Sequence, residues 1–161
     1  MFLDHFRNRF FPAELAARGL ITADAKALYD NAVRSAFERI GASAATADSL
    51  LGSGMPYEFS SIVDSQLMDI GVQKWAAMAN VNPYEGFLER NRLDQPEILP
   101  TTTYTTPPIG NEGAALFLPK HTVLGNDYIK RYMLPESEVL SNAKFPENQT
   151  NITDRLWWDV E

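Results

Sequence analysis

The sequence predicts a mainly α-helical fold in which helical hairpins are followed by a long irregular segment. Apolar residues recur at steps of three and four through residues 25–40, which places them on one face of a helix. Residues that typically start or stop helices bracket further segments before Pro96. Beyond Pro96 the chain is rich in Thr, Pro and Gly and keeps no lasting period. We therefore expect helical hairpins in residues 1–95 and an irregular wrapping segment in residues 96–161.

The first predicted hairpin joins a short helix at residues 12–19 to a longer helix. Pro12 suits the first helical turn and Gly19 suits the stop. The longer helix has Thr22 as its expected N-cap and Gly41 as the residue after its end. Its apolar stripe consists of Ala25, Leu28, Tyr29, Ala32, Val33, Ala36, Phe37 and Ile40. Because the connection is short, the two helices should be antiparallel.

The second predicted hairpin follows a small, flexible stretch. Residues 42–57 predict a loop, within which residues 44–51 are compatible with a short helix. A helical pattern resumes near Ser61, although Gly71 weakens its middle. Its core candidates are Ile62, Leu67, Ile70, Trp75 and Met78.

The last helix of this hairpin has a clear start and stop. Asn82 is a favourable N-cap, Pro83 suits the first helical position, and Glu85 can bond back to the cap. Pro96 restricts the residue before it and lacks a backbone N–H, so the helix should end before Pro96.

Composition excludes several partners and anchors. With 21 acidic and 14 basic residues, the chain has a formal charge of −7 and lacks an obvious source of phosphate neutralisation, so we expect no nucleic acid. No apolar run approaches the roughly 20 residues that cross a bilayer, and charges interrupt the N-terminal residues where a signal peptide would be apolar. There is no cysteine, so any lipid anchor must lie outside these residues.

The sequence shows no catalytic apparatus. His5 and His121 are far apart and belong to no metal-binding motif, and there is no nucleophile elbow or phosphate loop. The carboxylates lie on predicted helix faces and turns, where a solvated surface explains nearly all of them, and a glycosidase pair among them stays open as an alternative. We expect a protein that is not an enzyme, with no catalytic residues, no metal and no cofactor.

The best candidates for ligand binding lie in the irregular segment. Sugar rings pack their C–H faces on aromatic side chains, while their hydroxyls bond to nearby polar groups. Loops often carry such residues, although the same aromatics can simply anchor a loop. The candidates are Tyr104, Phe117, Asn126, Asp127 and Tyr128.

Four segments of the chain carry motifs in a consistent order. The first is ELAARGLITADAKALYDNAVRSAFERIG, whose Glu14, Gly19, Leu28, Tyr29 and Gly41 resemble the helical hairpin of the SusD/RagB family. The second is the Gln-Lys-Trp helix at residues 73–75, and the third is EGFLERNRLDQP, which keeps Glu85, Arg92 and Pro96. The fourth is KRYMLPESEVLSN, followed by LWWD, and it matches at Arg131, Pro135, Glu138 and Asn142.

The third segment departs from the family pattern. The departures are Phe87 for Trp, Asn91 for Arg, and Asp94 and Gln95 for Gly and Tyr. They mark a divergent member, for which the starch ligand of the family's namesake should not be assumed. The resemblance implies an architectural role for the motif residues, with Trp75 in the core and with Arg92 and Glu85 in buried polar contacts.

The resemblance implies the C-terminal part, residues 1–161, of a tetratricopeptide-like SusD fold. Family members are outer-membrane lipoproteins on the surface of Bacteroidetes, with the anchor in an N-terminal part that lies outside this chain. They cover a SusC-like TonB-dependent transporter and capture glycans or other nutrients without cleaving them. The alternative is a helical protein-interaction scaffold without ligand affinity of its own, and hydrolysis of a bound glycan would favour an enzyme instead.

Overall fold

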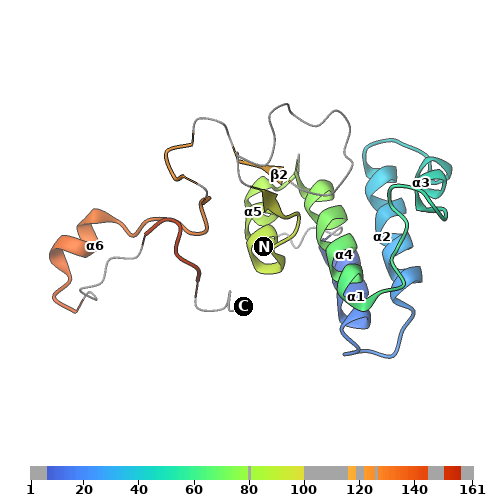
Figure 1. Ribbon diagram of the computed structural model, residues 1–161, viewed down its shortest axis with the longest axis horizontal. Coiled ribbons are helices and arrows are strands. Elements are labelled where there is room, and N and C mark those ends of the chain that lie inside the picture. Colours follow the sequence, from blue (N-terminus) through green and yellow to red (C-terminus); the bar gives the residue numbers. More distant parts are fainter. Residues whose placement is uncertain are drawn as a thin grey trace. The chain divides into compact units, whose positions relative to one another are not determined.

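A computed structural model describes residues 7–79, 81–99, 116–118, 122–125, 127–144 and 151–156. Within these residues the chain forms six helices and two short strands, so the predicted mainly helical class is confirmed. The chain divides into two compact units, Met1–Pro96 and Glu97–Glu161. We call them the helical unit and the C-terminal unit (Figure 1). The helical unit holds α1 (Arg7–Ala17), α2 (Ala25–Arg39), α3 (Ala44–Leu51), α4 (Val63–Met78) and α5 (Pro83–Leu93).

Helices α1 and α2 form the first hairpin. They pack along one another, and the turn between them brings the chain back antiparallel, as predicted (Figure 1). Gly19 and Gly41 follow the two helices with φ of 68° and 81°, a left-handed conformation that glycine adopts without a steric cost. Both predicted helix stops are confirmed.

Two predicted details of this hairpin are wrong. Helix α1 extends from Arg7, so Pro12 lies inside it rather than in its first turn. The N-cap of α2 is Asp24 and not Thr22, because the helix begins at Ala25 and the Asp24 carboxylate accepts the N–H of Ala27 at 3.1 Å.

Tyr29 is the central residue of the apolar core. It is 1% exposed, its ring centroid lies 4.8 Å from that of Phe59, and its hydroxyl donates to the carbonyl of Tyr57 at 3.2 Å. The ring is therefore buried while its one polar group is satisfied. Phe10 of α1, Leu51 of α3 and Ile70 of α4 belong to the same core, so this cluster joins four helices.

Helix α3 lies within the stretch that was predicted mainly as a loop. Ser43 caps it by accepting the N–H of Thr46 at 3.2 Å. Ala47 and Leu51, four residues apart, are buried against the core, at 0% and 5% exposure. The short helix that the sequence allowed at residues 44–51 is therefore present.

Helices α4 and α5 form the second hairpin. The Asn82 side chain accepts the N–H of Glu85 at 3.3 Å, Pro83 begins α5, and Asp94 ends it with φ of 49°. The predicted cap and the end before Pro96 are confirmed.

The buried line of α4 differs from the predicted core. Ile70, Lys74 and Met78 are 0%, 1% and 2% exposed and follow one another at four-residue steps, whereas Trp75 is only partly buried. One residue along a helix is a rotation of about 100°, which turns Trp75 away from this line. Ile62 precedes the helix and is 64% exposed, so its assignment to the core was also wrong.

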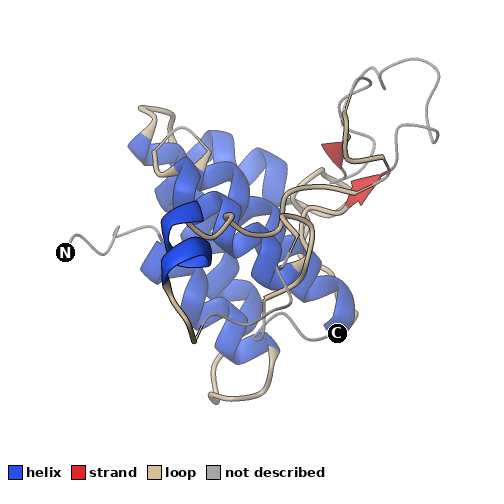
Figure 2. Cartoon of the chain, turned by 90° about the vertical axis from the view of Figure 1, so that its left-hand side faces the viewer, coloured by secondary structure: helices blue, strands red, loops and turns tan. Residues whose placement is uncertain are grey.

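The C-terminal unit contains little regular structure. Strands β1 (Ile98–Leu99) and β2 (Leu116–Phe117) form a parallel pair in which Ile98 lies opposite Leu116 (Figure 2). The backbone N–H groups of Lys130 and Arg131 donate to the carbonyl of Ile152 at 2.9 and 3.2 Å. A short helix, α6 (Glu136–Ser141), follows.

Gly71 permits close approach between α4 and the turn after α5. It is buried, and a Cβ atom at this position would lie 2.6 Å from the Cβ of Gln95. That distance is too short for two carbon atoms, so the residue that weakens the helical pattern is needed for packing.

We expect Gly71→Ala to lower the free energy of unfolding by about 1–2 kcal/mol, because the clash exceeds the gain in helix propensity. Urea denaturation would measure the loss. Gly52→Ala is the control, because its Cβ would meet Met55 Cγ at an ordinary 3.5 Å. An equal or smaller effect at Gly71 than at Gly52 would contradict the packing argument.

Candidate functional site

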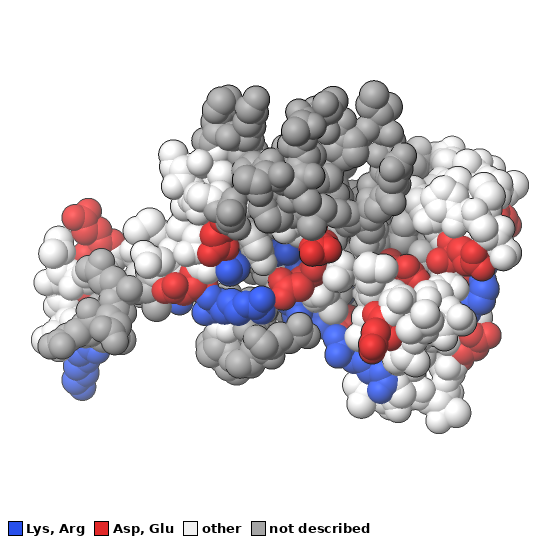
Figure 3. Space-filling model, in the orientation of Figure 1, with Lys and Arg blue, Asp and Glu red and all other residues white. Residues whose placement is uncertain are grey.

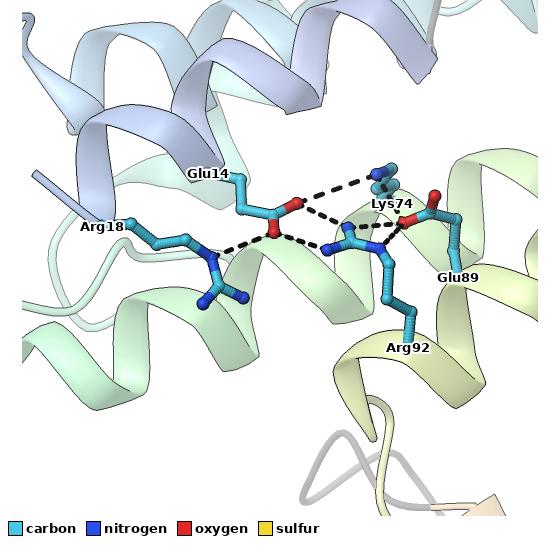
Figure 4. A network of polar contacts seen from close by, with 5 residues as sticks. All are labelled: Glu14, Arg18, Lys74, Glu89 and Arg92. Carbon is cyan, nitrogen blue, oxygen red and sulfur yellow. Dashed lines mark hydrogen bonds and ion pairs between the residues drawn. The ribbon is translucent and has the colours of Figure 1, made fainter. Parts of the chain in front are cut away.

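Two groups of polar residues are candidates for a functional site, one in each unit. The first, which we call the charge cluster, consists of Glu14, Arg18, Lys74, Glu89 and Arg92 and joins α1, α4 and α5 (Figure 4). The second lies at residues 127–130 of the C-terminal unit.

Arg92 is the hub of the charge cluster. Its Nη1 and Nη2 donate to the two carboxylate oxygens of Glu14 at 2.8 and 2.7 Å. Its Nε and Nη2 also donate to Oε2 of Glu89 at 3.1 and 2.7 Å. One planar guanidinium therefore binds two carboxylates, and the bidentate bond fixes both the distance and the orientation of Glu14.

Lys74 supplies the second positive charge. Its Nζ lies 2.7 Å from Oε2 of Glu89 and 4.0 Å from Oε2 of Glu14. The exposed fractions of Lys74, Glu14 and Glu89 are 1%, 3% and 7%, whereas 34% of the Arg92 side chain is exposed. Lys74, Glu14 and Glu89 are thus buried from solvent, whereas Arg92 reaches the surface.

The cations keep both carboxylates ionised. Burial alone would raise the pKa of Glu14, but hydrogen bonds and charge from Arg92, with Lys74 and Arg18, hold it below its ordinary value. Burial acts on Glu89 in the same way, and Lys74 and Arg92 together lower its pKa. Neither carboxylate holds a proton to donate at neutral pH, so the cluster is built for structure rather than for general acid catalysis.

The sequence analysis partly anticipated this cluster. The buried polar role predicted for Arg92 is confirmed. Glu85 is partly buried, and its backbone N–H bonds to Asn82. Glu14 was expected to be architectural as a residue of the family motif, whereas the burial of Glu89, at 7% exposure, was not predicted. One feature of the sequence could have indicated a buried carboxylate. Lys74 lies on the same helix face as the apolar residues Ile70 and Met78, and a buried lysine needs a partner of opposite charge.

The structure describes only part of the predicted ligand-binding set. Tyr104 and Asn126 lie outside the described residues, and for Phe117 only the backbone, in β2, is described. Asp127 and Tyr128 are both partly buried, and the Asp127 carboxylate accepts the N–H of Tyr128 at 2.8 Å. Their binding role stays a prediction.

Lys130 joins Asp127 and Tyr128, and the sequence analysis missed it. Its Nζ lies 3.0 Å from Oδ1 of Asp127 and 5.0 Å from the centroid of the Tyr128 ring. Burial opposes ionisation of Asp127, but the bond to Lys130 and the N–H of Tyr128, together with the charge of Lys130, lower its pKa. An aromatic ring, a carboxylate and an ammonium group therefore lie together at the surface, a combination that offers both stacking area and hydrogen-bonding groups.

Other kinds of site find no support in the described residues. They hold no group of three or more His, Asp or Glu side chains placed to bind a metal ion. None of the helices described combines the length and apolar character that crossing a bilayer requires. On the face drawn in Figure 3, Lys and Arg side chains lie among Asp and Glu side chains and form no separate basic patch.

Fold and site together define a mainly helical, hairpin-built protein whose buried charges hold its helices in place. A sequence model of the family described as "Starch-binding associating with outer membrane" matches residues 1–114. The chain belongs to this SusD-like family. No curated protein matches the sequence.

A solved structure described as "Bacteroidetes AC2a SusD-like" has a similar fold, with a TM-score of 0.65 and 22% sequence identity. The similarity covers 98% of this chain and 30% of the solved chain. The present chain thus spans under a third of the length of the structure it resembles.

We expect Lys74→Ala to lower the free energy of unfolding by about 3 kcal/mol, because it leaves Glu89 buried with one fewer cation. Lys26→Ala is the matched control. Lys26 also makes a 2.7 Å ion pair, with Asp30, but 52% of its side chain is exposed, so its loss should cost less than about 0.5 kcal/mol. Chemical denaturation of both variants measures the difference, and equal losses would contradict the assigned role of burial.

Proposed function

We propose that this chain is part of a non-catalytic protein that captures a glycan or another nutrient at the outer-membrane surface. The family match over residues 1–114 carries this proposal, since the description of the family names both starch binding and the outer membrane. The ligand would pass to a SusC-like TonB-dependent transporter. The lipid anchor would lie in a further, N-terminal part of the same protein.

The chemistry of the charge cluster suits a structural role rather than a catalytic one. Its buried carboxylates, Glu14 and Glu89, are occupied by Arg92 and Lys74, and their lowered pKa values suit them to accept hydrogen bonds permanently. A glycoside hydrolase that acts with a pair of carboxyl groups would need one of them to stay protonated near neutral pH, which neither Glu14 nor Glu89 does.

The proposed ligand surface is in the C-terminal unit. It comprises Tyr104, Phe117, Asn126, Asp127 and Tyr128, and the contacts of Lys130 add this residue to the set. A ring with a carboxylate and an ammonium beside it can stack on a sugar and bond to its hydroxyls.

A protein-interaction scaffold is the second candidate, and a groove in the helical unit favours it. The groove lies between the C-terminal halves of α2 and α4 and has a volume of about 240 Å³. Phe37, Ala77 and Val81 are among its mainly apolar lining residues, and Val81 is 38% exposed. Apolar hollows of this kind accept side chains of a partner.

We expect Tyr128→Ala to weaken the binding of an oligosaccharide at least about 10-fold, because stacking contributes on the order of 1.5 kcal/mol. Isothermal titration of the whole protein against a panel of oligosaccharides and peptides would first identify the ligand. Titration of that ligand into the unsubstituted protein and the variants would then compare their affinities. Tyr84→Ala in α5 is the control, because Tyr84 is 55% exposed in the other unit.

Two results would decide against parts of this proposal. Binding of peptides but of no oligosaccharide would exclude a glycan as the ligand. Unchanged affinity in Tyr128→Ala would exclude the surface around Tyr128 as the binding site. Capture of the transporter by a protein without any ligand affinity would favour the scaffold instead.

A further inference from the structure

Ser60 attaches the connection between α3 and α4 to helix α4 (Figure 1). Its backbone N–H donates to Oδ2 of Asp69 at 2.8 Å, and its carbonyl accepts from Nε2 of Gln66 at 3.0 Å. Phe59, the residue before it, is 7% exposed and lies with its ring against that of Tyr29 in the core. The connection is therefore held by one buried ring and by two polar side chains of α4.

Asp69 is a partly buried carboxylate without a cation beside it. Among the residues that the structure describes, no Lys or Arg forms an ion pair with it. Glu14 and Glu89 differ in this respect, because Arg92 and Lys74 neutralise them. A carboxylate that loses water without gaining a positive charge is favoured in its protonated form. Burial accordingly raises the pKa of Asp69, although its one backbone hydrogen bond opposes this.

Helix α4 and the charge cluster supply no compensating charge. The residues three and four positions away from Asp69 on α4 are uncharged, namely Ser65, Gln66, Val72 and Gln73. Helices α1 and α5 bring their charges to α4 at Lys74. Lys74 is five positions after Asp69, which turns it about 140° away around the helix. The cations of the charge cluster therefore face another side of α4.

Helix α2 and the connection supply no compensating charge either. Burial, with the charges of Asp69 and Asp30, raises the pKa of the Tyr29 phenol, which therefore stays neutral beside Asp69. Asp30 is paired with Lys26 at 2.7 Å. The Glu58 carboxylate accepts a backbone N–H within the connection at 2.6 Å. Each of these groups is thus neutral, negative or already paired.

We propose that Asp69 makes the attachment of the α3–α4 connection sensitive to pH, so that the attachment is strongest in acid and weakens as Asp69 ionises. A carboxyl group whose pKa is raised by folding stabilises the folded state fully below its ordinary pKa, and this stabilisation is lost as the pH rises through the folded pKa. The charge cluster responds in the opposite sense, because the lowered pKa values of Glu14 and Glu89 give a stability that is lost in acid. This pH response belongs to the helical unit and requires no ligand.

Asp69→Asn tests the proposal in the 161-residue chain. Asparagine keeps an oxygen that can accept the N–H of Ser60, but it carries no charge that burial penalises. Near neutral pH, the equilibrium constant for unfolding in urea should be at least about 3-fold lower in this variant than in the unsubstituted chain. The two constants should converge as the pH falls, and their ratio at each pH cancels the titration of the charge cluster.

Asp64→Asn is the control for the loss of a negative charge from α4. Asp64 is exposed in the first turn of the helix, where a negative charge is favourable, so this variant should gain no stability near neutral pH. NMR of the carboxyl carbon of Asp69 needs no variant and decides the matter if Asp69→Asn does not fold. This carbon should titrate above the ordinary range of an aspartate, and the amide proton of Ser60 should shift with the same midpoint.

Three outcomes would overturn the proposal. Titration of Asp69 within or below the ordinary range of an aspartate would show that burial is offset by the bond to Ser60. Lower stability of Asp69→Asn than of the unsubstituted chain near neutral pH would show that the ionised bond is the stronger one. A gain in stability that is equal at every pH would assign the effect to packing rather than to ionisation.

Discussion

The bidentate bond between Glu14 and Arg92 ties the first helix of the helical unit to the last. The two residues are 78 positions apart, and both carboxylate oxygens of Glu14 accept from the guanidinium, at 2.8 and 2.7 Å. Lys74, between them on α4, neutralises Glu89. Charges in a dry interior are costly unless each has a partner with good geometry. We infer that this requirement fixes how the two hairpins lie against one another.

The charged residues of the family motif hold the helices together, and they differ from the residues that we propose for ligand contact. The family motif at residues 73–92 supplies Lys74, Glu89 and Arg92, and all three are engaged in holding helices. These three side chains are thus committed to contacts within the helical unit. In the C-terminal unit, the ring of Tyr128 lies beside Lys130, which pairs with Asp127, and these are the residues for which we propose ligand contact.

The sequence predicted the parts of the fold that local chemistry determines. The Asn82 cap, the stop at Gly41 and the helical stripe through Tyr29 depend on neighbours in the chain, and the structure has all three. It did not predict that Lys74 is buried and Trp75 partly exposed, because hydrophobicity alone cannot show that Glu89 is close enough to neutralise a lysine. The candidate ligand residues lie where no period constrains the backbone, so sequence could name residue types but not their contacts.

A double-mutant cycle on Glu14→Gln and Arg92→Met tests the central claim most directly. Each single variant and the double variant would be unfolded in urea, and the coupling free energy calculated from the four stabilities. We expect a coupling of about 1–2 kcal/mol, which allows for the partial exposure of Arg92. The same cycle on the pair of Arg34 and Asp48, whose side chains are 34% and 52% exposed, should give about 0.3–0.5 kcal/mol. Additive effects at Glu14 and Arg92 would contradict the account, because the hairpins would then be held without this bond.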